Sequence, residues 1–114
     1  REDTARALGI TATLNTEHGV LTLSLAGKLN AFPEKLTLTL AHPTRQGMDQ
    51  ILILHHAGSG HYRATLPAMH AGKWHVELAD AASTWRLSGV LHTPFSQPVT
   101  ITSDAETTVQ PQGD

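Results

Sequence analysis

Hydrophobic and polar residues alternate with a period of two along most of this chain. In "VLTLSLAG" (Val20–Gly27) and "LTLTLAH" (Leu36–His42), leucines alternate with threonine or serine. Successive side chains of a strand point to opposite faces of a sheet, so this pattern predicts half-buried strands. The same reasoning predicts seven strands, at Ile10–Asn15, Val20–Gly27, Leu36–His42, Ile51–His56, Gly60–Pro67, Lys73–Ala79 and Thr84–His92.

The strand predicted at Ile51–His56, "ILILHH", breaks the alternation because it is apolar at every position up to Leu54. Continuous apolar runs of this length are typical of strands that are covered on both faces. We therefore expect this segment to be either a central strand or a strand covered by a loop or by the N-terminal lead-in.

Turn-forming Gly, Pro, Asp and Ser residues separate the predicted strands. This spacing predicts an all-β fold, an immunoglobulin-like two-sheet antiparallel sandwich of about seven strands. "VTIT" (Val99–Thr102) is able to add an edge strand. We expect residues 1–9 to form a lead-in, residues 10–102 the β-sandwich domain, and residues 103–114 a flexible tail.

Composition excludes several function classes. The chain has no cysteine, which excludes disulfides and thiolate metal sites. Its formal net charge is −2 and its basic residues form no cluster, which disfavours nucleic-acid binding. The serines lack a nucleophile-elbow context, the carboxylates are scattered, and no Gly-rich loop links a strand to a helix. The sequence therefore predicts a protein that is not an enzyme.

The histidines near the centre of the chain admit two interpretations. If Leu54 lies opposite Tyr62, then His55 lies opposite His61 on the outer face, close enough for two imidazoles to share a divalent ion. His56, at the loop edge, could complete such a site. Alternatively, these histidines are exposed polar residues of a structural hairpin.

Two further expectations concern the neighbouring segments. Pairing Trp74 with Leu66 in the next hairpin would bring Arg63 beside Glu77 as an exposed ion pair. His42 and Pro43 end their strand, because proline cannot continue a hydrogen-bonded ladder.

Four motifs occur in an order that resembles the FixH family, also called CcoH. They are "HPT" (42–44), "GHYRATLP" (60–67), "GKWHVEL" (72–78) and "WRLSG" (85–89), and the resemblance extends from about Arg1 to Leu91. The resemblance implies a small, non-enzymatic periplasmic domain that is anchored in the bacterial inner membrane by an N-terminal transmembrane helix. The chain opens "REDTARALGI" with no initiator methionine, and we expect such an anchor to precede it.

Family members act in the assembly or stability of a cbb-type haem–copper cytochrome oxidase and are encoded with a copper-transporting P-type ATPase. The resemblance therefore implies cytochrome oxidase subunits and that ATPase as partners, with no resident cofactor. We expect the partner-binding surface in the loop His42–Asp49, at His42, Pro43 and Arg45. The alternative is a copper-binding chaperone domain that uses His55, His56 and His61.

Overall fold

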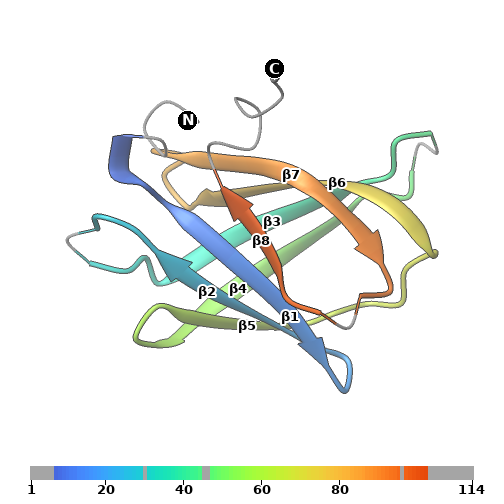
Figure 1. Cartoon of the computed structure of the whole chain (residues 1–114), viewed down its shortest axis with the longest axis horizontal. Helices are drawn as coiled ribbons and strands as arrows, with labels where there is room; N and C mark the ends of the chain where they lie inside the picture. Colours follow the sequence, from blue (N-terminus) through green and yellow to red (C-terminus); the bar gives the residue numbers. More distant parts are fainter. Residues whose placement is uncertain (1–6, 30, 45–46, 96, 103–114) are drawn as a thin grey trace.

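Eight antiparallel strands form one sheet that curls until its two outermost strands lie against each other (Figure 1). The computed structural model describes residues 7–29, 31–44, 47–95 and 97–102. The strands are β1 (Thr11–Glu17), β2 (Val20–Ala26), β3 (Lys35–Ala41), β4 (Gln50–Gly58), β5 (His61–Thr65), β6 (Gly72–Asp80), β7 (Arg86–Thr93) and β8 (Val99–Thr102). Their order across the sheet is β7-β6-β3-β4-β5-β2-β1-β8.

The all-β antiparallel prediction is confirmed, and so are most of the inward-facing positions. The leucines that alternate with threonine or serine in β2 and β3 are buried, and the alternation of the other predicted strands likewise buries Tyr62, Trp74, Trp85 and Leu87. The eighth strand is the segment Val99–Thr102, which pairs with β1. The predicted sandwich has two halves, β7-β6-β3-β4 and β5-β2-β1-β8. Hydrogen bonds between β4 and β5 join these halves, so that the strands form a nearly closed sheet.

The first hairpin shows how local sequence sets the register. His18 and Gly19 connect β1 to β2, and both have positive φ angles, 54° and 77°. Two consecutive residues of this kind form the tight turn whose twist matches that of the flanking strands. The turn fixes the pairing of Leu14 with Leu23, which places both side chains in the core.

The joint between the two halves is short. β4 pairs with β3 at six positions but with β5 at only three, and the register shifts between His56 and Gly58. Beyond Arg63, β5 continues along β2 alone, with Ala64 opposite Leu21. The first half of β4 is therefore paired on one side and not on the other among the described residues.

β4 is a central strand in the order of the sheet, as one of the two predicted alternatives has it, but the expectation that Ile51–Leu54 is covered on both faces is wrong. Leu54 is fully buried, but the side chains of Ile51 and Ile53 are 66% and 45% exposed. The outer face of β4 points away from the core, and no described segment packs over it. An apolar run has the same appearance in sequence whether its second face meets the core of its own fold or remains open.

The predicted pairing of Trp74 with Leu66, which would bring Arg63 beside Glu77, is also wrong. β5 pairs with β2 and β4, whereas β6 pairs with β3 and β7, because residues 66–71 carry the chain from one half of the sheet to the other. Glu77 instead forms an ion pair with Arg86, at an N–O distance of 3.4 Å. Both side chains are about half exposed, so this pair contributes at most about 1 kcal/mol.

Some predictions concern segments that the structure does not describe. Most of the lead-in, residues 1–6, and the predicted tail, residues 103–114, lie outside the described residues. In the part of the chain that is described, no helix is long and apolar enough to cross a membrane.

Two glycines with nearly equal φ angles provide a matched stability test. A Cβ at Gly60 (φ 80°) would lie 2.8 Å from the carbonyl oxygen of Leu25 and 2.9 Å from the Phe32 ring, whereas a Cβ at Gly19 (φ 77°) would meet nothing within 4 Å. Both changes to alanine carry the left-handed backbone cost of about 1 kcal/mol. We expect Gly60→Ala to lower the free energy of unfolding by about 1–3 kcal/mol more than Gly19→Ala, because it also overpacks the site.

Denaturant unfolding of the two variants beside the parent chain measures this difference. Equal destabilisation by the two substitutions would contradict the close packing of Leu25 and Phe32 on Gly60.

Candidate functional site

The β4–β5 hairpin end is closed by an aromatic cluster that contains one of the three candidate metal ligands. The ring of His56 stacks on Phe32, with ring centroids 5.6 Å apart, and lies 5.0 Å from the ring of Tyr62. Its Nε2 accepts a hydrogen bond from the backbone N–H of Gly60 at 3.0 Å. The Tyr62 hydroxyl donates to the carbonyl of Pro33. His56 therefore holds the hairpin and the preceding loop together.

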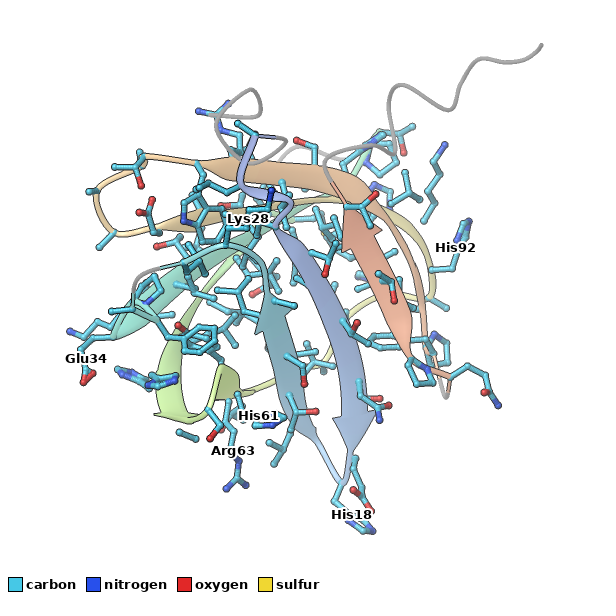
Figure 2. The ribbon with its side chains drawn as sticks, turned by 60° about the vertical axis from the view of Figure 1, so that its left-hand side comes forward. His18, Lys28, Glu34, His61, Arg63 and His92 are labelled. Carbon is cyan, nitrogen blue, oxygen red and sulfur yellow. The ribbon has the colours of Figure 1, made fainter. Side chains whose placement is uncertain are left out.

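The other two histidines do not face each other, so the predicted pairing of His55 with His61 is wrong. The hairpin turns at Ser59 and Gly60, and β4 pairs His55 with Arg63 and Gly58 with His61. Nδ1 of His61 is hydrogen-bonded to Oγ of Ser24 at 3.1 Å, on the outer face. Figure 2 shows His61 and Arg63 at this end of the sheet, where Arg63 projects away from the ribbon.

These contacts leave no preformed three-ligand arrangement at the hairpin. His55 and His56 are adjacent in one strand and so point to opposite faces. Among the described residues, no group of three or more His, Asp or Glu side chains is placed to hold a metal ion. A copper site built on His55, His56 and His61 stays a prediction.

The loop between β3 and β4 contains the candidate partner-binding residues. The His42 ring is half-buried and packs edge-on against Trp74, with centroids 5.0 Å apart, and its Nδ1 accepts a hydrogen bond from the backbone N–H of Thr44 at 3.2 Å. Pro43 is exposed, and Arg45 lies outside the described residues. Of the two described candidates, His42 shapes the loop and Pro43 is accessible to another molecule.

A chain of contacts connects this loop to a pocket at the same end of the molecule. Trp74, which supports His42, donates its indole N–H to the carbonyl of His70 at 3.0 Å. The hydroxyl of Thr93 donates to the same carbonyl at 2.7 Å. Because Thr93 lines the pocket, the loop and the pocket share one structural support.

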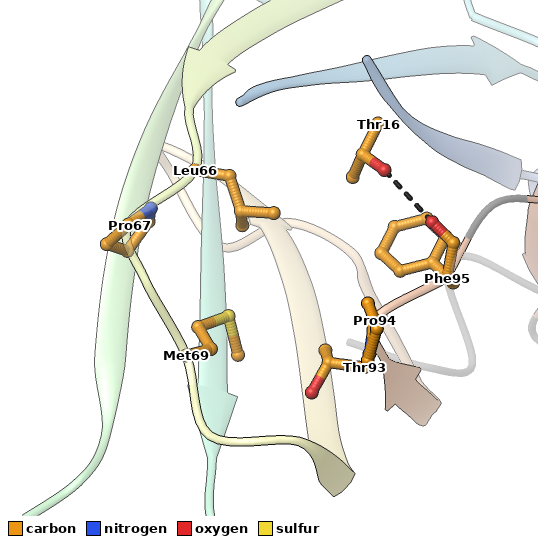
Figure 3. Close-up of a pocket in the computed structure, with 7 residues that line it drawn as sticks. All are labelled: Thr16, Leu66, Pro67, Met69, Thr93, Pro94 and Phe95. Carbon is orange, nitrogen blue, oxygen red and sulfur yellow. Dashed lines mark hydrogen bonds between the residues drawn. The ribbon is translucent and has the colours of Figure 1, made fainter. Parts of the chain in front are cut away.

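The pocket has a volume of about 220 Å³ and is mainly apolar (Figure 3). Its lining residues are Thr16, Leu66, Pro67, Met69, Thr93, Pro94 and Phe95. The Thr16 hydroxyl is already satisfied, because it donates to the carbonyl of Phe95 at 3.0 Å. No lining side chain is titratable, so the pocket offers no acid–base chemistry. Its size and lining suit the insertion of one apolar side chain.

Sequence reasoning missed this pocket. Its walls come from the end of β1, from the β5–β6 connection, and from the end of β7 with the connection that follows it, which are far apart in sequence. The only local signals are the prolines that follow Leu66 and Thr93, and these indicate the end of a strand rather than a cavity.

The family model described as FixH matches residues 1–92 of the chain. No curated protein and no solved structure is significantly similar to it.

Tyr62 provides a spectroscopic test of the hairpin cluster, because it is the chain's single tyrosine. Burial and, to a smaller extent, the negative charge of Glu34 raise the pKa of Tyr62 to about 12. Absorbance of the tyrosinate should therefore titrate near pH 12 in the folded protein and near pH 10 in denaturant.

Because the folded state favours the neutral phenol, the stability contribution is fully present below about pH 10 and is lost as the pH rises through the folded value. Tyr62→Phe should remove this part of the pH dependence. A folded protein whose tyrosine titrates near pH 10 would contradict the burial of the hydroxyl beside Pro33.

Proposed function

This chain belongs to the FixH family, and from that premise we propose that it is a non-enzymatic accessory protein for a cbb-type haem–copper cytochrome oxidase. It supports assembly or stability of the oxidase at the periplasmic face of the bacterial inner membrane. The observation that carries the proposal is the family match over residues 1–92, which extends from before β1 to the last residues of β7.

The positions of the motif residues support a binding role rather than catalysis. Gly60 and Tyr62 close the hairpin end of the sheet, and His42 and Trp74 pack together under the β3–β4 loop. These residues are held by packing and by satisfied hydrogen bonds. They therefore shape two ends of a domain that can present a surface to another protein.

We place the docking surface at the end of the molecule that contains the loop His42–Asp49 and the apolar pocket. Exposed Pro43 and the pocket lined by Met69 lie on segments that share the carbonyl of His70 as a support. An apolar side chain of an oxidase subunit fits the pocket, while the loop contacts the surrounding surface. Arg45, within the same loop, would pair with a carboxylate of that subunit.

The finer part of the proposal follows from the family alone. It links the accessory role to copper delivery, with a copper-transporting P-type ATPase as a second partner. It also includes attachment to the membrane through an N-terminal transmembrane helix in the full-length protein.

The docking surface is tested in cells that lack the parent gene. Full-length protein should restore the membrane level of the oxidase and co-purify with it. Pro43→Ala combined with Arg45→Ala should lower co-purification about tenfold, which corresponds to the loss of about 1.4 kcal/mol of binding free energy. The matched control changes two exposed basic residues at the opposite end of the molecule, Lys28→Ala with Arg86→Ala, and should leave co-purification unchanged.

Two results would count against different parts of this account. Unchanged association of the folded loop variant would exclude the loop as the docking surface. An oxidase that assembles normally without the parent gene would contradict the accessory function itself.

A copper titration separates this proposal from the chaperone alternative. If the protein acts by docking, Cu(I) and Cu(II) should bind with about micromolar or weaker affinity, because the described histidines form no three-ligand site. The double variant His55→Ala, His61→Ala should behave like the control His18→Ala, His92→Ala. Tighter binding that only the first double variant abolishes would instead support a copper-binding chaperone.

A further inference from the structure

One edge of the first half of β4 is unpaired among the described residues. The backbone N–H of His56 donates to the carbonyl of Glu34 at 2.9 Å, next to the pairing of His55 with Lys35. Hydrogen-bonded pairs alternate along an antiparallel ladder. Leu54, Leu52 and Gln50 therefore bond toward β3, and the N–H and C=O groups of Ile51 and Ile53 point to the opposite edge.

No described segment occupies that opposite edge. β5 pairs with β4 only from His55 onward, and no backbone hydrogen bond of Ile51 or Ile53 to another described segment is formed there. The same two residues carry the most exposed isoleucine side chains of the chain, at 66% and 45%. Edge strands are usually protected by charged residues or proline, and Gln50–Leu54 contains neither.

We propose that this edge is the interface of a homodimer. A second copy of the chain pairs its own Gln50–Leu54 segment antiparallel to the first, about a two-fold axis through Leu52. The pairing continues the sheet from one copy into the other and satisfies the free backbone groups of Ile51 and Ile53. The inference goes beyond the proposed accessory function and does not rest on it.

The outward-facing residues of this segment are self-complementary. Ile51, Ile53 and His55 lie on one face of the strand and Asp49 comes just before it, which gives the order acid, apolar, apolar, base. Rotation about Leu52 places Ile51 opposite Ile53 of the second copy. It also brings Asp49 toward His55, beside which lies Arg63. Each end of the interface therefore pairs an acidic side chain with a basic group.

Other two-fold registers are less favourable. An axis through Ile53 would place Ile51 opposite His55, and an axis through Ile51 would place Asp49 opposite Ile53. Both registers set polar or charged groups against isoleucine. Only the axis through Leu52 matches apolar with apolar and acid with base.

The limits of the free edge also fit this arrangement. At His55 the edge is taken by Arg63 of the same copy, so the shared ladder ends at Leu54. Asp49 precedes β4 and lies outside the ladder, where its side chain can reach the base from the loop. The interface is small, so we expect a weak dimer, with a Kd on the order of 10–1,000 µM.

Sedimentation equilibrium of the chain over about 1–1,000 µM tests the proposal. The parent chain should pass from monomer to dimer, and Ile53→Lys should raise the Kd at least about tenfold because it sets a charge against Ile51 of the second copy. Val90→Lys is the matched control. Val90 is an outward-facing valine of β7 with 40% exposure and lies away from the β4 edge. It should leave the Kd unchanged.

A charge exchange tests the register. Asp49→Arg alone should weaken the dimer, and Asp49→Arg combined with His55→Glu should recover part of the loss. A folded parent chain that remains monomeric at the highest concentration would overturn the proposal. Dimerisation that Ile53→Lys and Val90→Lys affect equally would also overturn it. If the parent chain is monomeric and Ile53→Lys impairs binding to another protein, the edge receives a strand of that protein instead of a second copy.

Discussion

The short joint between β4 and β5 is the constraint on which the rest of the structure depends. β4 pairs with β3 at six positions, but its ladder with β5 covers only three before β5 turns along β2. This joint connects the two halves of the sheet and determines at which end of the molecule they are in contact. At the hairpin end the halves are held together, and beyond Arg63 they separate.

The closed and open ends have different physical properties. At the closed end, Phe32 and His56 pack with Tyr62 around Gly60, where there is no room for a Cβ atom. At the open end, the separation of β5 from β4 leaves the edge of Ile51 and Ile53 without a partner strand in the described part of the chain, and the crossing segment 66–71 contributes to an apolar pocket. The two ends therefore differ in packing: aromatic side chains close one end, and the other offers backbone groups and a pocket on which the proposed docking surface depends.

The sequence predicts the strands and their inward faces, because alternation directly reports which side chains are buried. Alternation does not show which strands are neighbours, and for that reason the prediction that Arg63 lies beside Glu77 is wrong. The prediction that His55 faces His61 is wrong because the chain turns at Ser59 and Gly60, which places Arg63 opposite His55, and the glycines of this segment do not show in the sequence where the turn falls. The exposure of Ile51 and Ile53 could not be predicted, since an apolar run gives no indication of whether a cover belongs to the same chain.

Residue-resolved amide hydrogen exchange along β4 most directly tests whether its first half has a free edge. In dilute solution, the amides of Leu52 and Leu54 should be protected by their bonds to β3, and those of Ile51 and Ile53 should exchange much faster. Protection of the two isoleucine amides should then rise with protein concentration as a second copy pairs with the edge. Equal and concentration-independent protection of all four amides would contradict the account.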